Sequence, residues 1–316
     1  MRISVIMAAY NGARFIEEQL YSICHQSRTP DEVIILDDHS TDETVNIIKR
    51  FINDNDLAAS WKLFINDHNI GWRKNFFQGI EMATGDIIFF SDQDDIWMPN
   101  KIEIMTGAME REDVGCVYGG YEFIDDNGVA IPGAEGRKNV ATVNEIVKFN
   151  TIVTMGCRMC INREIADAYL KVNAPEYSYD TQIGRLAYLY SRMSIIQNVV
   201  IKYRIHSSNT SGISSVAEEG SLSLEERIRE IEENIKWLDK LREYDVEYKK
   251  GTNKELFDNV VAFQNQRVRY LKGEGRQLIF SLNPYFYRDK TMMVGDFVYR
   301  HRLNRIMKGL RSKCNG

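Results

Sequence analysis

The chain has no apolar run of about 18 residues, the length that a helix needs to cross a bilayer. Its first seven residues enter an apolar segment directly and lack the layout of a secretory signal. Cysteine is scarce and odd in number, with five in 316 residues. We therefore expect no membrane-spanning helix, and reduced thiols in a cytosolic protein rather than a disulfide framework.

Acidic residues outnumber basic ones, and the resulting net charge of -5 argues against general nucleic-acid binding. An apolar content of 44% and a charged content of 27% are those of an ordinary globular protein. One stretch departs from this average: residues 284–316 contain eight Lys or Arg against two Asp. We expect this basic tail to have a different partner from the rest of the chain.

Two of the cysteines, Cys157 and Cys160, have the spacing of a redox or zinc half-site. No second Cys/His pair is spaced to complete a zinc site, and no helix start is evident beside them. We interpret both as strand residues.

Short apolar segments alternate with helical periodicity through the first hundred residues. Segments 3–8, 33–36, 61–65 and 87–90 predict buried strands. Between them, apolar residues recur at spacings of three and four and predict helices, with Ser40 or Thr41 capping the second. This alternation predicts an α/β fold with a largely parallel, Rossmann-like sheet and right-handed crossovers.

The pattern changes after residue 100. A helix over 100–111 is followed by strand-like segments at 115–118, 121–124, 156–161 and 195–203, by a hairpin-type turn at 126–128 and by a helix over 181–190. We expect this part of the sheet to be more antiparallel. Residues 207–223 predict a lid or linker rich in Ser and Gly, and two apolar stripes after Leu224 predict a helical hairpin. The expected division is 1–210, 207–223 and 224–316.

An acidic cluster, Asp92, Asp94 and Asp95, directly follows the strand at 87–90. Ligands of open α/β sheets gather outside the carboxyl ends of the strands. Three carboxylates this close repel one another unless a cation or hydrogen-bond donors absorb their charge, and Mg²⁺ or Mn²⁺ takes oxygen ligands. The alternative is an acidic turn in which Asp95 caps a helix near Pro99.

Four motifs occur in order along this part of the chain. They are Val5-Ile-Met-Ala-Ala-Tyr-Asn11, Asp37-Asp38-x-Ser-Thr-Asp42, Asn69-x-Gly71 followed by Gly85-Asp86, and Asp92-x-Asp94-Asp95. In this order and spacing they resemble the family-two inverting glycosyltransferases of GT-A fold, over about residues 1–210. The later Tyr203-Arg204-x-His206-x-x-Asn209 resembles the rhamnosyltransferase-like bacterial branch of that family.

The resemblance implies a nucleotide site. Asp38 would accept the N3–H of a pyrimidine, Ala8 and Tyr10 would contact the nucleotide, and Asp92 would hold the ribose or assist the metal. Arg73 would add a phosphate contact; alternatively, it is an exposed helix residue.

The resemblance also implies a metal and a base. Asp94 would bind Mn²⁺ or Mg²⁺, and His206 would ligate the metal or touch the diphosphate, although a lone histidine is more often structural. Asp180 matches the position of the base that deprotonates the acceptor hydroxyl. Family members often have an acidic pair there, whereas this chain has Tyr179 before Asp180, and Asp180 can also serve only as a helix cap.

The tail carries Leu303, Ile306, Met307 and Leu310 at helical spacing beside four basic residues, which predicts an amphipathic helix for an anionic bilayer surface. A polyprenyl-diphosphate-linked acceptor, usual in this branch, would explain it. The protein would then be cytoplasmic and peripheral at the inner face of the plasma membrane. The alternative is an ordinary helix packed on the hairpin.

The expected function is therefore transfer of a sugar from a UDP- or dTDP-sugar to a glycan hydroxyl, with inversion, in bacterial surface polysaccharide synthesis. A sugar-1-phosphate nucleotidyltransferase is the first alternative, but the turn at residues 8–12 lacks a Gly-rich, Arg-bearing phosphate loop. A non-catalytic, membrane-associated scaffold is the second.

Overall fold

The computed structural model describes residues 1–131, 155–191, 193–206, 223–274, 296–297 and 300. The chain divides into two compact units, Met1–Ser207 and Ser208–Gly316. Residues 207–222, expected as a lid or linker, and the basic tail from 301 lie outside the described residues.

The first unit is built on one sheet with the strand order β3-β2-β1-β4-β7-β6-β8-β5. The strands β3, β2, β1 and β4 are mutually parallel, which confirms the expected Rossmann-like half. Their carboxyl ends therefore meet along one edge. The strand bounds are β1 Ile3–Ala9, β2 Glu32–Asp37, β3 Trp61–Ile65, β4 Ile87–Ser91, β5 Ile96–Trp97, β6 Cys116–Ile124, β7 Met159–Asn162 and β8 Met193–Arg204.

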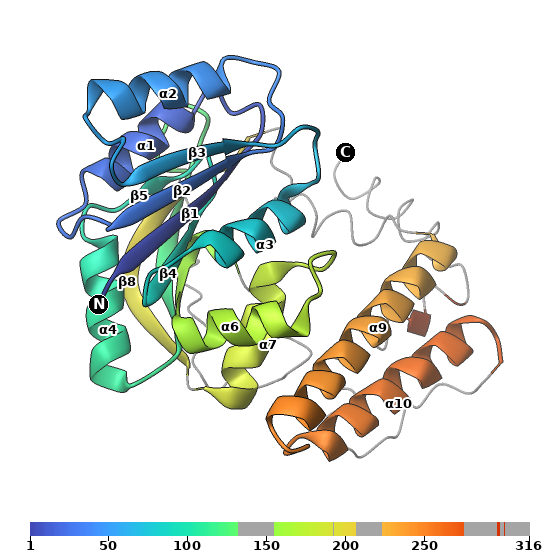
Figure 1. Cartoon of the computed structure of the whole chain (residues 1–316). Coiled ribbons are helices and arrows are strands. Elements are labelled where there is room, and N and C mark those ends of the chain that lie inside the picture. The colour runs from blue at the N-terminus through green and yellow to red at the C-terminus, as the bar shows by residue number, and fades with distance from the viewer. Residues whose placement is uncertain (132–154, 192, 207–222, 275–295, 298–299, 301–316) are drawn as a thin grey trace. The chain divides into compact units, whose positions relative to one another are not determined.

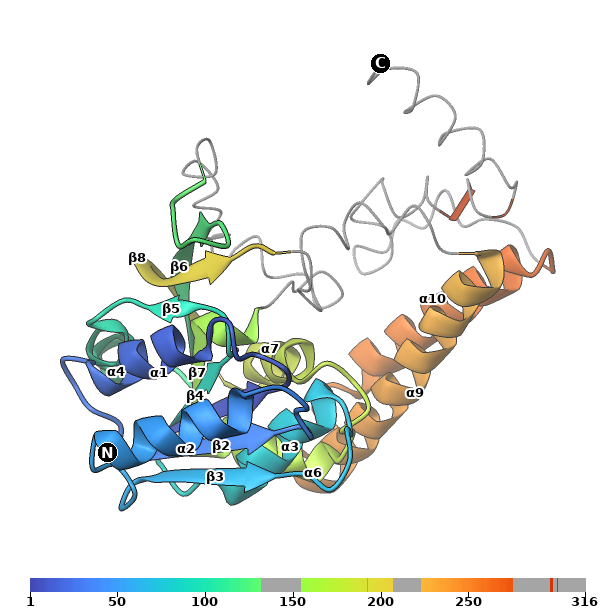
Figure 2. The ribbon, with the colours of Figure 1, turned by 90° about the horizontal axis from the view of Figure 1, so that it is seen from above.

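Helices cover both faces of this sheet (Figure 1; Figure 2). Ile3, Val5 and Met7 of β1 belong to the core beneath α1 (Ile16–Cys24), α2 (Thr44–Asp54) and α4 (Lys101–Glu112). Ile6 faces the other layer, where it lies so close to α3 (Trp72–Met82) that a Cβ on Gly79 would overlap it. That layer also contains α6 (Arg163–Val172) and α7 (Tyr179–Tyr190). Because both faces of the sheet are covered, β1 is apolar at nearly every position.

Three expectations for this unit are wrong in detail. Helix α6 was not expected, although Ile165, Tyr169 and Val172 form its buried face. The two strand segments at 115–124 are one strand, and β8 runs parallel to β6. The expected antiparallel part is nevertheless confirmed, because among the described strands β7 pairs antiparallel with β4 and β6, and β5 pairs antiparallel with β8. Neither Ser40 nor Thr41 caps α2, because that helix begins at Thr44.

The second unit contains the expected helical hairpin, α9 (Leu224–Tyr248) and α10 (Lys254–Leu271). A capping box starts α9, in which Ser223 and Glu226 each bond to the other's backbone N–H. In this unit Arg267 and Asp296 form a buried ion pair with N–O distances of 2.7 and 2.8 Å. None of the described helices is both long and apolar enough to cross a membrane.

Candidate active site

The acidic turn, residues 92–95, connects β4 to β5 at the carboxyl edge of the sheet. Gln93 joins it to the end of β1. Its Oε1 accepts the Tyr10 N–H at 2.8 Å, and its Nε2 donates to the Tyr10 carbonyl at 2.9 Å. Gly12 allows this contact, since a Cβ there would overlap the Gln93 amide. Gln93 was not among the predicted site residues.

The two predicted metal ligands, Asp94 and His206, are in contact. Asp94 Oδ2 lies 2.8 Å from His206 Nε2, although the residues are 112 positions apart in the chain. The His206 ring lies 4.9 Å from the ring of Phe15. Both ligand side chains are largely buried, with 17% of Asp94 and 7% of His206 exposed. The end of β8 therefore delivers an imidazole to the acidic turn.

Arg204 holds these two segments together, and sequence reasoning had assigned it no role. Its side chain is 1% exposed. Its backbone N–H donates to Asp95 Oδ1 at 3.1 Å, and its Nε donates to the Asp94 carbonyl at 2.8 Å. The remaining guanidinium nitrogens donate to the carbonyls of Asp125 and Asp126 and to Glu18 Oε2. Asp95 thus receives a strand-end N–H and does not cap α4, which begins at Lys101.

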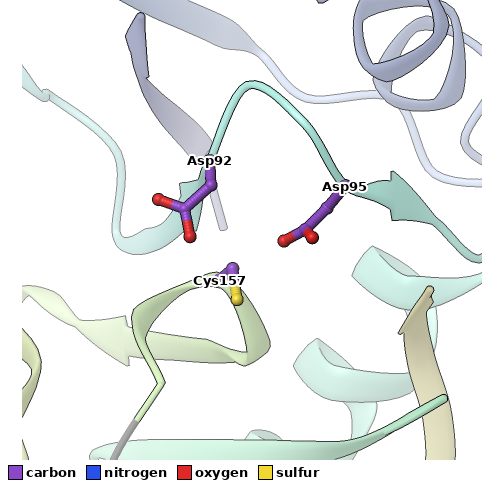
Figure 3. A group of neighbouring side chains, drawn as sticks. All are labelled: Asp92, Asp95 and Cys157. Carbon is purple, nitrogen blue, oxygen red and sulfur yellow. The ribbon is translucent and has the colours of Figure 1, made fainter. Parts of the chain in front are cut away.

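The side chains of Asp92 and Asp95 converge on Cys157 and form a cluster with it (Figure 3). Ligand atoms of the three residues lie within 4.8 Å of one another. Burial, followed by the negative charges of Asp94 and Asp180, raises the pKa of Asp92 to about 7. Burial also raises the pKa of Asp95. The cluster therefore favours protonated carboxyls unless a cation binds there.

Lys101 is a cation of the chain that lies beside the cluster of Asp92, Asp95 and Cys157. Its Nζ donates to the Cys157 carbonyl at 2.6 Å and lies 3.7 Å from the centre of the Trp97 ring. Burial lowers the pKa of Lys101 to about 7, and the charges of Asp95 and Asp92 oppose that change. Lys101 thus offsets part of the repulsion among the carboxylates.

The ligand chemistry favours one position for a metal. Burial raises the pKa of the Cys157 thiol, so the thiol stays protonated and is a poor ligand for a hard cation. Asp94 and His206 offer an oxygen and a nitrogen 2.8 Å apart. Two neighbouring ligands of an octahedral ion with bonds of 2.0–2.1 Å lie about 2.9 Å apart. The residues present therefore fit a divalent ion at Asp94 and His206.

Asp180 lies in the first turn of α7, within electrostatic reach of Asp92, since its charge contributes to the raised pKa of Asp92. Its Oδ1 accepts the Thr181 N–H at 2.7 Å and the Ser178 hydroxyl. Within the described part of the chain, no hydrogen bond is formed to Oδ2. Burial raises the pKa of Asp180. One oxygen thus positions the carboxyl at the helix start and leaves the other available to a ligand.

Asp38 and Arg73 belong to a second group along the same edge. Asp38 is buried and accepts from the N–H groups of Ile70 and Gly71, each at 2.8 Å, and from Asn66 Nδ2 at 2.9 Å. It thereby fixes the loop before α3. Arg73 is exposed and lies 4.8 Å from the ring of Trp72. A carboxylate offers about four acceptor positions, so Asp38 retains capacity for one further donor.

Ala8 and Tyr10, the other two predicted nucleotide contacts, lie at the end of β1. Ala8 is half-buried, and the Tyr10 side chain is 46% exposed. Among the described residues, no hydrogen bond joins Asp38 to Asp92 or Asp94. The structure therefore places Asp94 in contact with His206, and Asp92 within electrostatic reach of Asp94 and Asp180. The nucleotide roles stay predictions.

Residues 4–170 match the family model described as glycosyl transferase family 2, more than half of the chain. The chain belongs to glycosyl transferase family 2. The match contains the acidic turn, Gln93 and the loop held by Asp38, but ends before Asp180 and His206.

This family 2 chain is similar to two named relatives and to one solved structure. It is 31% identical over 146 residues to the UDP-Glc:alpha-D-GlcNAc-diphosphoundecaprenol beta-1,3-glucosyltransferase WfgD of Escherichia coli, covering 46% of this chain and 55% of WfgD. It is 36% identical over 113 residues to the dTDP-rhamnosyl transferase RfbG of Shigella flexneri, covering 35% of this chain and 39% of RfbG. Staphylococcus aureus TarS in complex with UDP-GlcNAc superimposes with a TM-score of 0.58 at 17% identity, covering 89% of this chain and 77% of TarS. The likeness to TarS confirms the GT-A fold.

Proposed function

We propose that this family 2 chain is an inverting, metal-dependent glycosyltransferase in bacterial polysaccharide synthesis, using a UDP- or dTDP-sugar and a hydroxyl of a glycan acceptor. The observation that carries the proposal is the contact between Asp94 and His206, beside an Asp92 whose pKa is raised in part by the charges of Asp94 and Asp180. The names of WfgD and RfbG, which specify UDP-Glc and dTDP-rhamnosyl transfer, support a pyrimidine donor.

Asp94 and His206 would hold Mn²⁺ or Mg²⁺ with help from Asp92. When bound, the ion neutralises charge on the departing nucleoside diphosphate. Arg204 keeps both ligands in place by tying β8 to the Asp94 carbonyl. The burial of the Asp94 and His206 side chains strengthens these electrostatic interactions.

Asp180 is the base of the proposed reaction. Its Oδ2 takes the proton of the acceptor hydroxyl, while Ser178 and Thr181 orient the carboxyl through Oδ1. The raised pKa strengthens Asp180 as a base near neutral pH. A single base on the acceptor side, with direct attack on the anomeric carbon, gives inversion.

The nucleotide would bind along the β1 and β2 ends, with the base against Ala8 and Tyr10. Asp38 would use its remaining acceptor position for the pyrimidine N3–H, and a mismatched base would leave that buried carboxylate oxygen unpaired. Arg73 would reach the diphosphate from the start of α3. The acceptor we propose is polyprenyl-diphosphate-linked, as the name of WfgD suggests, at the inner face of the plasma membrane, where the basic tail would bind anionic lipid.

Thermal stability in the presence of nucleotides tests this function. We expect UDP or dTDP with Mn²⁺ to raise the melting temperature, whereas GDP and ADP do not. A ligand at 100 times its dissociation constant stabilises by about 2.7 kcal/mol. The shift should require the metal and disappear in Asp94→Asn, but persist in Asp54→Asn, which changes an exposed carboxylate at the end of α2. Absence of a response to every nucleotide would favour the non-catalytic scaffold.

The pH dependence of transfer tests the base. Asp180 must be ionised to act, so kcat/KM should fall tenfold per pH unit as pH falls through its folded pKa. Because burial raises that pKa, the midpoint should lie above the ordinary aspartate value of about 3.9. Measurements at saturating Mn²⁺ in wild type and Asp180→Glu would separate Asp180 from Asp92, since only a limb that belongs to Asp180 moves with its replacement. A midpoint at or below the ordinary value contradicts the assignment.

A further inference from the structure

Arg158 is a partly buried cation beside the proposed active site, and the proposed reaction does not use it. It ends the short 3-10 helix η1 (Gly156–Arg158), which touches both halves of the site. Cys157 of η1 lies against Asp92 and Asp95, and Gly156 lies so close to Tyr179 that a Cβ would overlap the phenol oxygen. Arg158 thus follows directly on residues that contact the acidic turn and the start of α7.

The guanidinium of Arg158 has no anionic partner among the described residues. Its Nε is buried and forms no hydrogen bond, and its Cζ lies 4.8 Å from the centre of the Tyr121 ring. The ionisable groups that act on it most strongly are the Tyr121 phenol, the Cys157 thiol and the Tyr118 phenol, and no carboxylate is among them. Burial lowers the pKa of Arg158.

Two other arginines, both buried, each have a carboxylate partner. Arg204 is paired with Glu18, and Arg267 is paired with Asp296. Burial of the Arg158 Nε without a hydrogen bond is unfavourable and is not offset by any described carboxylate. A site that binds an anionic ligand is the simplest reason to retain such a residue beside the acidic turn.

Tyr118 supplies a second polar group at the same place. It is 4% exposed, and its hydroxyl contacts the Cys116 thiol, a weak hydrogen-bond partner, and no stronger partner among the described residues. It pairs across the sheet with Met159, the residue after Arg158. The charges of Asp180 and Arg158 act on its phenol in opposite directions, so Tyr118 lies within electrostatic reach of both.

We propose that Arg158 and Tyr118 form a subsite for an oxyanion, a phosphate or a carboxylate, on the acceptor sugar. The inference rests on the proposed function of the site. The donor diphosphate is assigned to the metal ligands Asp94 and His206, whereas the subsite lies on the Asp180 side, where the acceptor hydroxyl must approach. A guanidinium forms paired, charge-assisted hydrogen bonds to either oxyanion, and a buried phenol adds one more. The acceptor is then selected by its charge as well as by its hydroxyl.

Binding of sugar probes to the full chain loaded with Mn²⁺ and UDP tests the subsite, by calorimetry. The probes are N-acetylglucosamine 1-phosphate, glucuronate and the neutral sugars N-acetylglucosamine and glucose. We expect wild type to bind at least one anionic probe about tenfold more tightly than its neutral counterpart. Arg158→Met should abolish that preference, Arg158→Lys should retain part of it, and Arg111→Met, at an exposed position of α4, should leave it unchanged.

The other outcomes are distinguishable. Equal binding of charged and neutral probes by wild type, or an unchanged preference in Arg158→Met, would overturn the subsite. Weakened binding of Mn²⁺ and UDP in Arg158→Met would assign Arg158 to the donor and overturn its placement on the acceptor side. If wild type binds neither Mn²⁺ nor UDP, the proposed function fails first.

Discussion

Asp180→Asn is expected to lower kcat for sugar transfer by a factor of about 10²–10⁴, the usual contribution of a general base. Asparagine keeps the size of the side chain and can still accept the Thr181 N–H at the start of α7. It cannot take a proton from the acceptor hydroxyl. Binding of Mn²⁺ and UDP should therefore stay near the wild-type value, and the loss should appear in kcat.

A rescue experiment separates this role from simple helix capping. In Asp180→Ala, added formate should restore part of the activity, because a free carboxylate can enter the vacated space and act as the base. Ser178→Ala, which removes one donor to Oδ1, should change kcat far less. A full loss of nucleotide binding in Asp180→Asn, or activity close to wild type, would contradict the assignment.

Arg204→Met should lower the free energy of unfolding by about 3 kcal/mol, the order of one or two hydrogen bonds to a charged group left without a donor. The variant deprives the carbonyls of Asp94, Asp125 and Asp126 of their partner. Since the same side chain connects β8 to the acidic turn, the affinity for Mn²⁺ should also fall. Urea unfolding and metal titration measure the two effects.

Glu18→Gln is the matched control for Arg204. The Glu18 side chain is 55% exposed, so the ion pair with Arg204 is worth about 0–1 kcal/mol. Arg204→Lys retains the charge but loses the planar fork that reaches several carbonyls at once. If Glu18→Gln destabilises as much as Arg204→Met, the ion pair and not the carbonyl contacts holds the turn.

The sequence was sufficient to predict the parallel half of the fold. Strands β1, β2 and β4 are short apolar runs that end in polar or turn residues, so local pattern and burial agree. Strand β3 lies at the edge of the sheet, and Phe64 and Ile65 are exposed there. Helix α6 was missed because it directly follows β7 without a break, and Asn162 serves as both the last strand residue and the helix cap. Strand β5 has two residues, too few for any periodicity.

In the candidate site, too, some residues could be predicted from the sequence and others could not. The acidic chemistry of Asp92 and Asp94 could be predicted from the local sequence. The family resemblance predicted the roles of Asp180 and His206. The contacts of Gln93 and Arg204 could not be read, because they join residues 83 and 110 positions apart. The three donors around Asp38 also come from a distant loop. Positioning residues of this kind carry no local signal, since their partners are mostly backbone atoms.

The double hydrogen bond between Gln93 and Tyr10 would make the two proposed binding events, of nucleotide and of metal, interdependent. Tyr10 is assigned to the nucleotide base and the neighbouring Asp94 to the metal, so a ligand that orders one segment also orders the other. Thermodynamic linkage then requires that the ion tighten nucleotide binding by the same factor by which the nucleotide tightens ion binding. Donor and cation would load as a cooperative pair, and the release of either would hasten the departure of the other.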